Sequence, residues 1–353
     1  MKRIAIISVF LALLVSCAET KVQDNSISVI PEPMYCRADE GVFVIDKDTK
    51  IVVDDLSEEM QRIAGFLNEK LSKAAGFELE IVKDGPMPRE NFIAFMNAGL
   101  QSESYEINVV PQHILVDYGD GAGAFYALQT LFQLLPVEIF SQELQKRVDW
   151  TVPCCNIDDK PRFKYRGMHL DVCLHYFDLE FLKKYIDIMA AHKVNRFHWH
   201  LTEDQGWRLE IKKYPLLTEK GQWRKETVVG SLSSGVYDGI PHGGYYTQEQ
   251  VKELVKYAAD RYVTIIPEIE LPGHALAAIA CYPELSCGLE DHYETATRWG
   301  IFKQVYCPKE TTFEFLEDVF DEVFELFPSE LIHIGGDECP KASWKACPDC
   351  QAL

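Results

Sequence analysis

The second half of the chain alternates between short apolar runs and segments with helical periodicity, beginning after Lys160 and Pro161. The apolar runs predict strands at residues 165–172, 196–201, 263–270 and 331–334. The intervening helices are marked by an N-cap at Asp178 and by capping boxes at residues 247–250 and 311–314. Strands that are apolar on both faces and alternate with helices predict a parallel sheet.

This alternation favours an α/β fold, in which we interpret residues 159–353 as about the first four units of a (β/α)8 barrel of the TIM type. A doubly wound open sheet is the alternative, but no glycine-rich dinucleotide fingerprint follows any of the strands. Residues 27–158 carry short strand-like runs and two helical segments, one opening near Ser57 and one after Gly123. They predict a small α+β domain that precedes the barrel.

Polar residues of the types used in catalysis gather where we place the ends of these strands. The groups are Arg166 with Asp171, His200 with Glu203 and Asp204, residues 268–270 with His274, and Asp337 with Glu338. Active sites of such barrels lie at the carboxyl ends of the strands and in the loops that follow them. We therefore expect the four groups to form one site.

Residues 333–338 (HIGGDE) place two adjacent carboxylates after an apolar run that predicts a buried strand. Neighbouring side chains of a regular strand point to opposite faces, but Gly335 and Gly336 allow a sharp turn that brings both carboxylates together. Two carboxylates held close cannot both ionise freely, so one is expected to keep a proton near neutral pH. This is the chemistry of a general acid beside a charge stabiliser, and a solvated loop is the alternative.

Five stretches of the chain carry a distinctive set of motifs: residues 166–171 (RGMHLD), 198–208 (HWHLTEDQGWR), 243–247 (GGYYT), 272–274 (PGH) and 333–338 (HIGGDE). Together they resemble glycoside hydrolase family 20, the β-N-acetylhexosaminidases. They occur in the order of that family, and residues 27–158 are similar to the domain that precedes its catalytic barrel. The resemblance implies an enzyme that removes terminal non-reducing β-linked GlcNAc or GalNAc from glycans, with no cofactor and no metal ion.

In this family the acetamido oxygen of the substrate attacks the anomeric carbon, and the configuration is retained. The resemblance implies that Glu338 protonates the leaving oxygen and later activates water. Asp337 would accept a hydrogen bond from the acetamido N–H and stabilise the positive charge that develops there. No protein nucleophile is then needed, which accounts for two carboxylates that are neighbours in the chain.

The resemblance also implies substrate-binding roles for three further residues. Arg166 would hold sugar hydroxyls, His274 would tune the acid through a polar network, and Glu203 would polarise His274. The alternatives are a core arginine paired with Asp171, a satisfied core histidine and a solvated loop glutamate. Asp171 and Asp204 are interpreted as supporting residues behind the site.

The chain ends at Leu353, soon after Glu338, when only four strands have been predicted. Later strands of the family supply an aromatic wall around the acetamido group. We therefore expect the sequence to be the N-terminal part of an enzyme, and residues 18–353 to be inactive by themselves. The alternatives are a glycan-binding surface lipoprotein without turnover, an inactive fragment, and a relative that releases a disaccharide.

Residues 1–17 predict a lipoprotein signal peptide. Lys2 and Arg3 precede an apolar stretch too short to span a bilayer, and this stretch ends in LVSC, which resembles a lipobox with Cys17 as the modified residue. Lipidation would anchor the protein at a bacterial cell envelope, in the periplasm or at the outer-membrane surface, whereas an ordinary cleaved signal is the alternative. The net charge of −20 argues against a nucleic-acid partner.

The chain has eleven cysteines, a fairly high number. Cys154 and Cys155 are adjacent, and Cys347 and Cys350 form a single C-x-x-C. A zinc or redox role usually involves a second pair or a histidine, so this motif alone carries little weight. We expect most of the cysteines to be small core residues.

Overall fold

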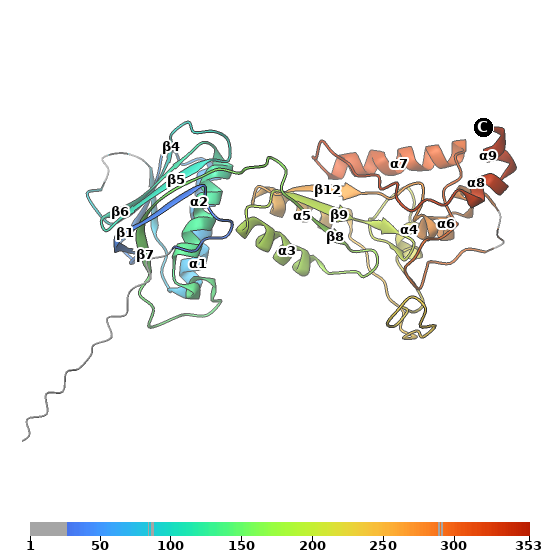
Figure 1. Ribbon diagram of the computed structural model, residues 1–353, viewed down its shortest axis with the longest axis horizontal. Helices are drawn as coiled ribbons and strands as arrows, with labels where there is room; N and C mark the ends of the chain where they lie inside the picture. Colours follow the sequence, from blue (N-terminus) through green and yellow to red (C-terminus); the bar gives the residue numbers. More distant parts are fainter. Residues whose placement is uncertain (1–26, 84, 86–87, 289, 291) are drawn as a thin grey trace, which may run out of the picture.

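The computed structural model describes residues 27–83, 85, 88–288, 290 and 292–353. These residues form two domains that lie side by side along the long axis of the molecule and are joined by a short connection after residue 159 (Figure 1). The signal peptide expected at residues 1–17 and its Cys17 lie outside this range. Within the described residues, every helix is too short or too polar to cross a membrane.

The first domain is built on a seven-stranded sheet with the order β1-β7-β5-β6-β4-β2-β3. Its strands are β1 (Tyr35–Val44), β2 (Lys50–Val53), β3 (Glu80–Lys83), β4 (Phe92–Asn97), β5 (Tyr105–Val110), β6 (His113–Tyr118) and β7 (Thr151–Asp159). Pairing is antiparallel from β1 to β6 and parallel from β6 to β3. The sequence did not predict β7, because Pro153 and two adjacent cysteines interrupt its period-two pattern.

Two helices pack against this sheet, as the sequence predicted. Helix α1 (Glu58–Ala74) begins at Ser57, whose side chain accepts a hydrogen bond from the Met60 amide. Helix α2 (Gly121–Leu134) begins at Asp120 and packs on β5, β6 and α1. Both helices lie on the side of the sheet that faces the second domain (Figure 1).

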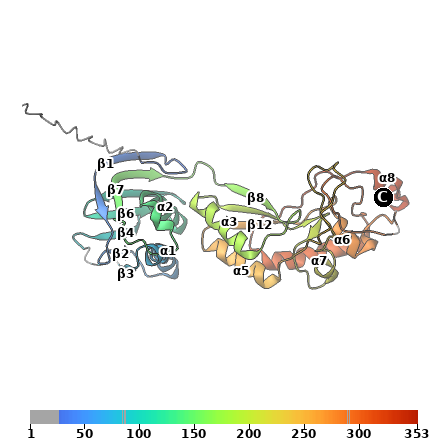
Figure 2. The same ribbon diagram turned by 90° about the horizontal axis from the view of Figure 1, so that it is seen from below.

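The second domain contains a parallel sheet of β8 (Gly167–Asp171), β9 (Arg196–His200) and β12 (Thr264–Glu268), in the order β12-β9-β8. Helices α3 (Leu179–Ala191), α5 (Gln248–Ala259) and α7 (Glu310–Leu326) pack in succession, α3 on α5 and α5 on α7, on one side of it (Figure 2). Each new strand is added to the same edge, which is the order of a barrel and not of a doubly wound sheet. The α/β fold class expected from the sequence is confirmed.

Shorter elements fill the connections of both domains. They are η1 (Val137–Phe140), β10 (Thr202–Glu203), β11 (Gly206–Trp207), α4 (Leu216–Glu219), α6 (Leu276–Cys281), η2 (Pro283–Leu285), α8 (Ala342–Ala346) and α9 (Pro348–Ala352). The β10–β11 hairpin carries Glu203 directly after β9. It therefore lies at the carboxyl end of the parallel sheet.

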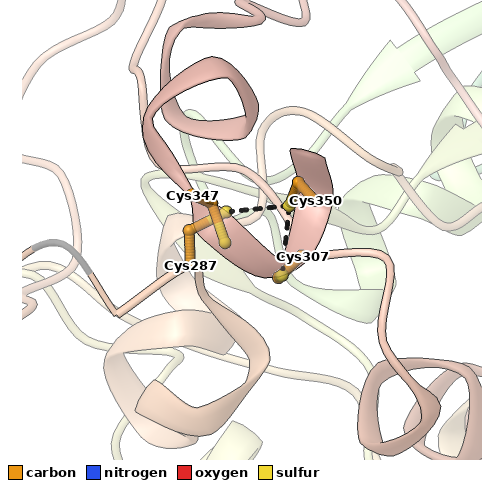
Figure 3. Close-up of side chains that lie close together, drawn as sticks. All are labelled: Cys287, Cys307, Cys347 and Cys350. Carbon is orange, nitrogen blue, oxygen red and sulfur yellow. Dashed lines mark hydrogen bonds between the residues drawn. The ribbon is translucent and has the colours of Figure 1, made fainter. Parts of the chain in front are cut away.

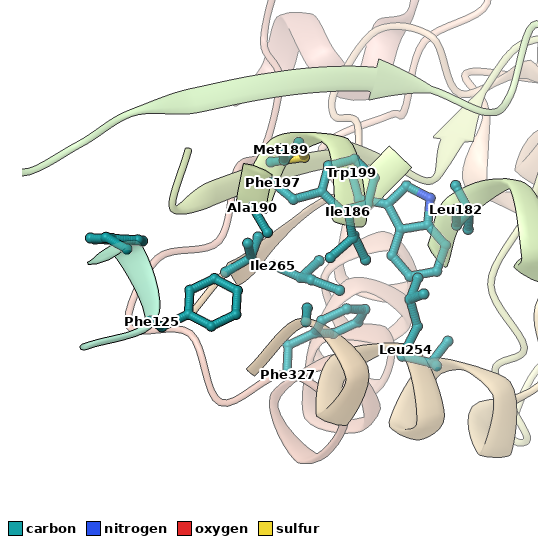
Figure 4. Close-up of a cluster of buried hydrophobic side chains, with 14 of the residues drawn as sticks. Phe125, Leu182, Ile186, Met189, Ala190, Phe197, Trp199, Leu254, Ile265 and Phe327 are labelled. Atoms are coloured by element: carbon teal, nitrogen blue, oxygen red, sulfur yellow. The ribbon is translucent and has the colours of Figure 1, made fainter. Parts of the chain in front are cut away.

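The core of the second domain lies between the sheet and its helices (Figure 4). Phe197 and Trp199 of β9 are fully buried there with Ile265 of β12. The other labelled members come from α3, α5, the end of α7 and α2: Leu182, Ile186, Met189, Ala190, Leu254, Phe327 and Phe125. The expectation that these strands are apolar on both faces is wrong, because the opposite face carries His169, His198 and His200.

Two local predictions also need correction. Residues 331–334 were predicted to form a buried strand, but they make a single parallel bridge between His333 and Glu268. Leu331 and Ile334 are 55% and 51% exposed, since no described element packs on that side. Helix α7 begins at Glu310, and no side chain caps it, so the capping box predicted at residues 311–314 is absent.

The amino ends of the parallel strands meet the first domain. Lys193, just before β9, donates hydrogen bonds to the Asp159 carboxylate (2.8 Å) and the Tyr105 hydroxyl (2.6 Å), and all three side chains are buried. Near β12, the Tyr262 hydroxyl donates to the Glu59 carboxylate of α1 (2.6 Å). The domain junction therefore contains a buried ion pair as well as apolar contacts.

Candidate active site

Asp337 and Glu338 lie on a tight turn beside the carboxyl end of β12. Gly335 and Gly336 have φ values of +63° and +100°, the left-handed region that favours glycine, as the sequence predicted. A Cβ at Gly335 would collide with the carboxyl group of Glu270, and the Gly336 amide donates a hydrogen bond to that group (2.9 Å). The turn that positions both carboxylates is therefore fitted around Glu270.

His274 connects the elements of the site. Its Nδ1 lies 2.9 Å from Glu203 Oε1 and 3.0 Å from Asp204 Oδ2. Its Nε2 lies 3.6 Å from Glu338 Oε2 and 4.0 Å from Asp337 Oδ2. The structure thus brings together five of the residues that the sequence selected.

The charge of His274 follows from its surroundings. Hydrogen bonds to Asp204 and Glu203 raise the pKa of His274 to about 11, so the ring is an imidazolium at neutral pH. Both ring nitrogens then donate, Nδ1 to Glu203 and Asp204 and Nε2 toward Glu338. Burial raises the pKa of Glu203 itself to about 7. The site therefore has one buried cation among several carboxyl groups.

Asp204 holds the loops on which the histidine depends. Its side chain is completely buried, and its second oxygen accepts a hydrogen bond from the Leu276 amide (2.9 Å) at the start of α6. Its backbone carbonyl accepts from the Ala296 amide (2.9 Å). Asp204 thereby joins the loop after β9 to the two segments that follow β12.

Asp171 lies at the same end of the sheet but outside this group. It pairs in register with His200, which pairs with Glu268. Its carboxylate accepts hydrogen bonds from the amides of Cys173 (2.6 Å) and Leu174 (3.1 Å) and so shapes the turn after β8. This is a supporting role for the loop backbone.

Arg166 is placed elsewhere, and its interpretation as a sugar ligand needs correction. It precedes β8, so it lies at the amino end of the strand, opposite to Asp171. Its guanidinium donates to both carboxylate oxygens of Glu103 (3.1 Å each) and to the Tyr126 hydroxyl (2.9 Å), which belong to the first domain. Because the donors are used at the domain junction, Arg166 joins the domains and does not face the carboxylate pair. It is not paired with Asp171 either.

The sequence placed Glu268 in the expected site, but it did not predict that Glu268 is the centre of a second polar group with His198 and His333. His198 Nε2 lies 2.6 Å from Glu268 Oε2, and His333 Nδ1 lies 2.8 Å from Glu268 Oε1. Burial opposes ionisation of Glu268, but the hydrogen bond from His198 and the nearby histidines lower its pKa to about 2. Burial raises the pKa of Glu270 to about 8. The two carboxyl groups therefore differ in protonation at neutral pH.

The spacing of these residues along their strands does predict that they lie together. His198 and His200 are two residues apart in one strand, and Glu268 and Glu270 are two residues apart at the end of another. Side chains at i and i+2 share a face of a sheet, so each pair had to point in one direction. The histidines and carboxylates have the donor types that hold divalent cations, and several lie within 4.8 Å of one another. His198 already hydrogen-bonds to Glu268, whereas the ring nitrogens of His200 lie 3.8 Å from Glu268 and 3.9 Å from Glu270.

Comparison with known proteins finds relatives that match both domains. The model of the glycosyl hydrolase family 20 catalytic domain matches residues 163–353, and the model of domain 2 of that family matches residues 26–160. A β-hexosaminidase of Porphyromonas gingivalis is 46% identical over 331 residues, which cover 93% of this chain and 41% of that protein.

Two solved structures are similar over both domains. The family 20 β-N-acetylhexosaminidase of Streptomyces coelicolor has a TM-score of 0.79 and 33% identity, covering 91% of this chain and 63% of that one. A Streptomyces plicatus β-hexosaminidase variant in complex with the product GlcNAc has a TM-score of 0.78 and 34% identity, covering 90% and 61%. The chain belongs to glycosyl hydrolase family 20. It spans about half the length of the curated relatives it matches.

Proposed function

We propose that this chain carries the acid and the charge stabiliser of an enzyme that hydrolyses terminal non-reducing β-linked N-acetylhexosamine. The observation that supports this most strongly is the array in which Glu203 and the fully buried Asp204 hold a charged His274 beside Asp337 and Glu338. The relatives named as β-hexosaminidases agree with it.

The proposed reaction uses the two carboxylates in different ways. The acetamido oxygen of the substrate attacks the anomeric carbon while Glu338 gives its proton to the leaving oxygen. Asp337 accepts a hydrogen bond from the acetamido N–H and balances the positive charge of the cyclic intermediate. Glu338 then removes a proton from a water molecule whose oxygen attacks the anomeric carbon. The bond between this carbon and the acetamido oxygen breaks, which restores the acetamido group, and Glu338 regains its proton. The imidazolium of His274 faces both groups and orients them.

The test compares Glu338→Gln and Asp337→Asn in the longest open reading frame that contains this chain. Glu338→Gln is expected to lower turnover of an unactivated glycan by about a hundred- to ten-thousandfold, the range for a general acid. The loss should be much smaller for a nitrophenyl N-acetylglucosaminide, because this leaving group needs little protonation. Asp337→Asn should impair both substrates, since the acetamido group still needs its partner.

The matched control is Glu294→Gln, which removes an exposed carboxylate from an ion pair with Lys225. It should leave both activities unchanged. Equal losses in the two site variants on the nitrophenyl substrate would contradict the division of roles. Full activity of Glu338→Gln on the unactivated glycan would reject Glu338 as the acid.

We also propose that the protein is attached to the cell envelope through a lipid on Cys17. The support is in the sequence, where a short apolar segment ends in LVSC and a polar stretch follows. Radiolabelled palmitate supplied to expressing bacteria should be incorporated into the parent and not into Cys17→Ser. Equal labelling of both, or of neither, would reject the anchor.

A further inference from the structure

Four cysteines from separate parts of the chain converge at the end of the second domain (Figure 3). Cys287 follows η2, Cys307 precedes α7, and Cys347 and Cys350 lie at the junction of α8 and α9. The intervals from Cys287 to Cys307 and from Cys307 to Cys347 are long and unequal, which explains why only the last pair was visible as a motif. The expectation that most cysteines are merely small core residues therefore does not account for this cluster.

The spacing of the sulfur atoms is that of a metal site. Cys350 Sγ lies 3.4 Å from Cys307 Sγ and 3.8 Å from Cys287 Sγ, and all four sulfurs lie within 4.8 Å of one another. Four thiolates at Zn–S bonds of about 2.3 Å in a tetrahedron have sulfurs about 3.8 Å apart. A disulfide needs an S–S distance of about 2.05 Å, and the described cysteines are all free.

The local backbone also fits a ligand loop. The Cys347 amide donates to the Ser343 carbonyl (3.0 Å) in α8, and the Gln351 amide donates to the Cys347 carbonyl (3.1 Å) in α9. The Cys307 amide donates to the Leu285 carbonyl (2.9 Å), which fixes Cys307 beside the loop of Cys287. These contacts hold the sulfurs in place through the backbone, as expected of a closed structural site.

We propose that Cys287, Cys307, Cys347 and Cys350 bind one structural zinc ion. Four thiolates in a tetrahedral set favour zinc among the common divalent ions. The four ligands occupy every tetrahedral position, so the ion has no open position for a substrate.

The ion would fasten the segment that follows the carboxylate pair. In that segment, the Trp344 indole donates to the Tyr306 carbonyl (2.9 Å), and the Ser343 hydroxyl donates to the Lys303 carbonyl (2.5 Å). Cys347 and Cys350 belong to the same segment, and through Cys307 they attach it to the same stretch of chain before α7. Zinc thereby ties residues 339–350 to the segment before α7, which supports the turn at Asp337.

The first test measures metal in the full chain purified without chelators. Elemental analysis should find one zinc per chain, and thiol titration after unfolding should find these four cysteines reduced. Replacement of zinc by cobalt(II) should produce the intense visible bands of tetrahedral cobalt and a thiolate charge-transfer band. These measurements need no mutation, so they remain informative if a variant fails to fold.

The second test uses matched cysteine variants. Cys347→Ser and Cys350→Ser should lose the zinc and the cobalt bands, whereas Cys339→Ser, in the same segment but outside the cluster, should keep both. The main competing outcome is oxidation, because disulfides form in the envelope of bacteria. Metal-free protein with two disulfides among these residues would overturn the proposal, as would iron in place of zinc or unchanged zinc in both site variants.

Discussion

The two ends of the parallel sheet in the second domain are built from different ion pairs. At the amino ends, Arg166 and Lys193 pair with Glu103 and Asp159 of the first domain. At the carboxyl ends, the carboxyl groups are paired with histidines, as His274 is with Glu203 and Asp204. Arginine and lysine keep their charge over the physiological range, whereas histidine titrates within it when unperturbed.

The two kinds of ion pair indicate which end of the sheet is adapted for stability and which for chemistry. Permanent charges that are fully paired hold two domains in one arrangement. At the carboxyl ends, carboxyl groups outnumber the histidines that pair with them, and several of these groups have shifted pKa values. They provide proton donors and acceptors, but the charge of each group depends on its neighbours. Substitutions at the two ends should therefore differ in their dependence on pH.

The largest expected effect is that of His274→Gln, which leaves the fully buried Asp204 and the largely covered Glu203 without a cation. We expect a loss of about 5 kcal/mol in unfolding free energy near pH 6, the upper end for breaking a buried pair. The folded pKa of about 11 lies above the unfolded value of about 6.5. The stabilisation is thus complete below about pH 6.5 and is lost as the pH rises toward 11, so the deficit should be smaller near pH 8.

Urea unfolding followed by tryptophan fluorescence is a suitable measurement, because all the tryptophans except Trp150 lie in the second domain. A deficit that grows between about pH 6 and pH 8 would contradict a charged His274.

At the amino ends of the strands, Lys193→Met should lower the unfolding free energy by about 3–4 kcal/mol. Asp159 loses its cation but keeps the hydrogen bond from Tyr105. Burial lowers the pKa of Lys193, yet the group is expected to stay charged from about pH 6 to 8, so the deficit should not change over this range. Lys183→Met is the control, since its partners Glu180 and Glu253 are exposed and the change should be small. A pH-dependent deficit for Lys193→Met would remove the contrast between the two ends.

Arg166→Lys should have a smaller effect, a loss of about 2 kcal/mol, because lysine cannot reproduce the paired bonds to Glu103 and the contact with Tyr126. Binding of N-acetylglucosamine, measured by calorimetry, should be unchanged. A selective loss of sugar binding with normal stability would restore Arg166 as a substrate ligand.

The smallest effect is expected for Tyr262→Phe, which removes a hydrogen bond to Glu59 at the exposed rim of the junction. A hydrogen bond from a neutral donor to an exposed carboxylate contributes about 1 kcal/mol to the unfolding free energy. The same urea series measures it, and a loss as large as that of Lys193→Met would mean that the rim, and not the buried pair, holds the domains together.

Local rules were sufficient for much of the fold. Ser57 and Asp178 marked helix starts because a capping side chain acts within three residues of itself. Gly335 and Gly336 marked the turn of the carboxylate pair because a positive φ is a property of the residue itself. Both kinds of signal are complete within a few consecutive residues.

Features that depend on distant partners could not be predicted in this way. Arg166 was assigned to the wrong end because an apolar run does not reveal which of its residues begins the strand. The cysteine cluster joins residues far apart in the chain, and no periodicity records such a meeting. The run at residues 331–334 is apolar enough for a buried strand, but burial requires neighbours on both sides.

The junction of Lys193, Tyr105 and Asp159 has a consequence for the connectivity of the chain. Asp159 is the last residue of β7, and Phe125 of the first domain lies in the core of the second. The domains are therefore attached through space as well as through the peptide bonds of residues 160–165. A chain cleaved within that connection would retain its arrangement as two fragments, whereas each fragment prepared alone would expose an unpaired charge and an uncovered apolar surface.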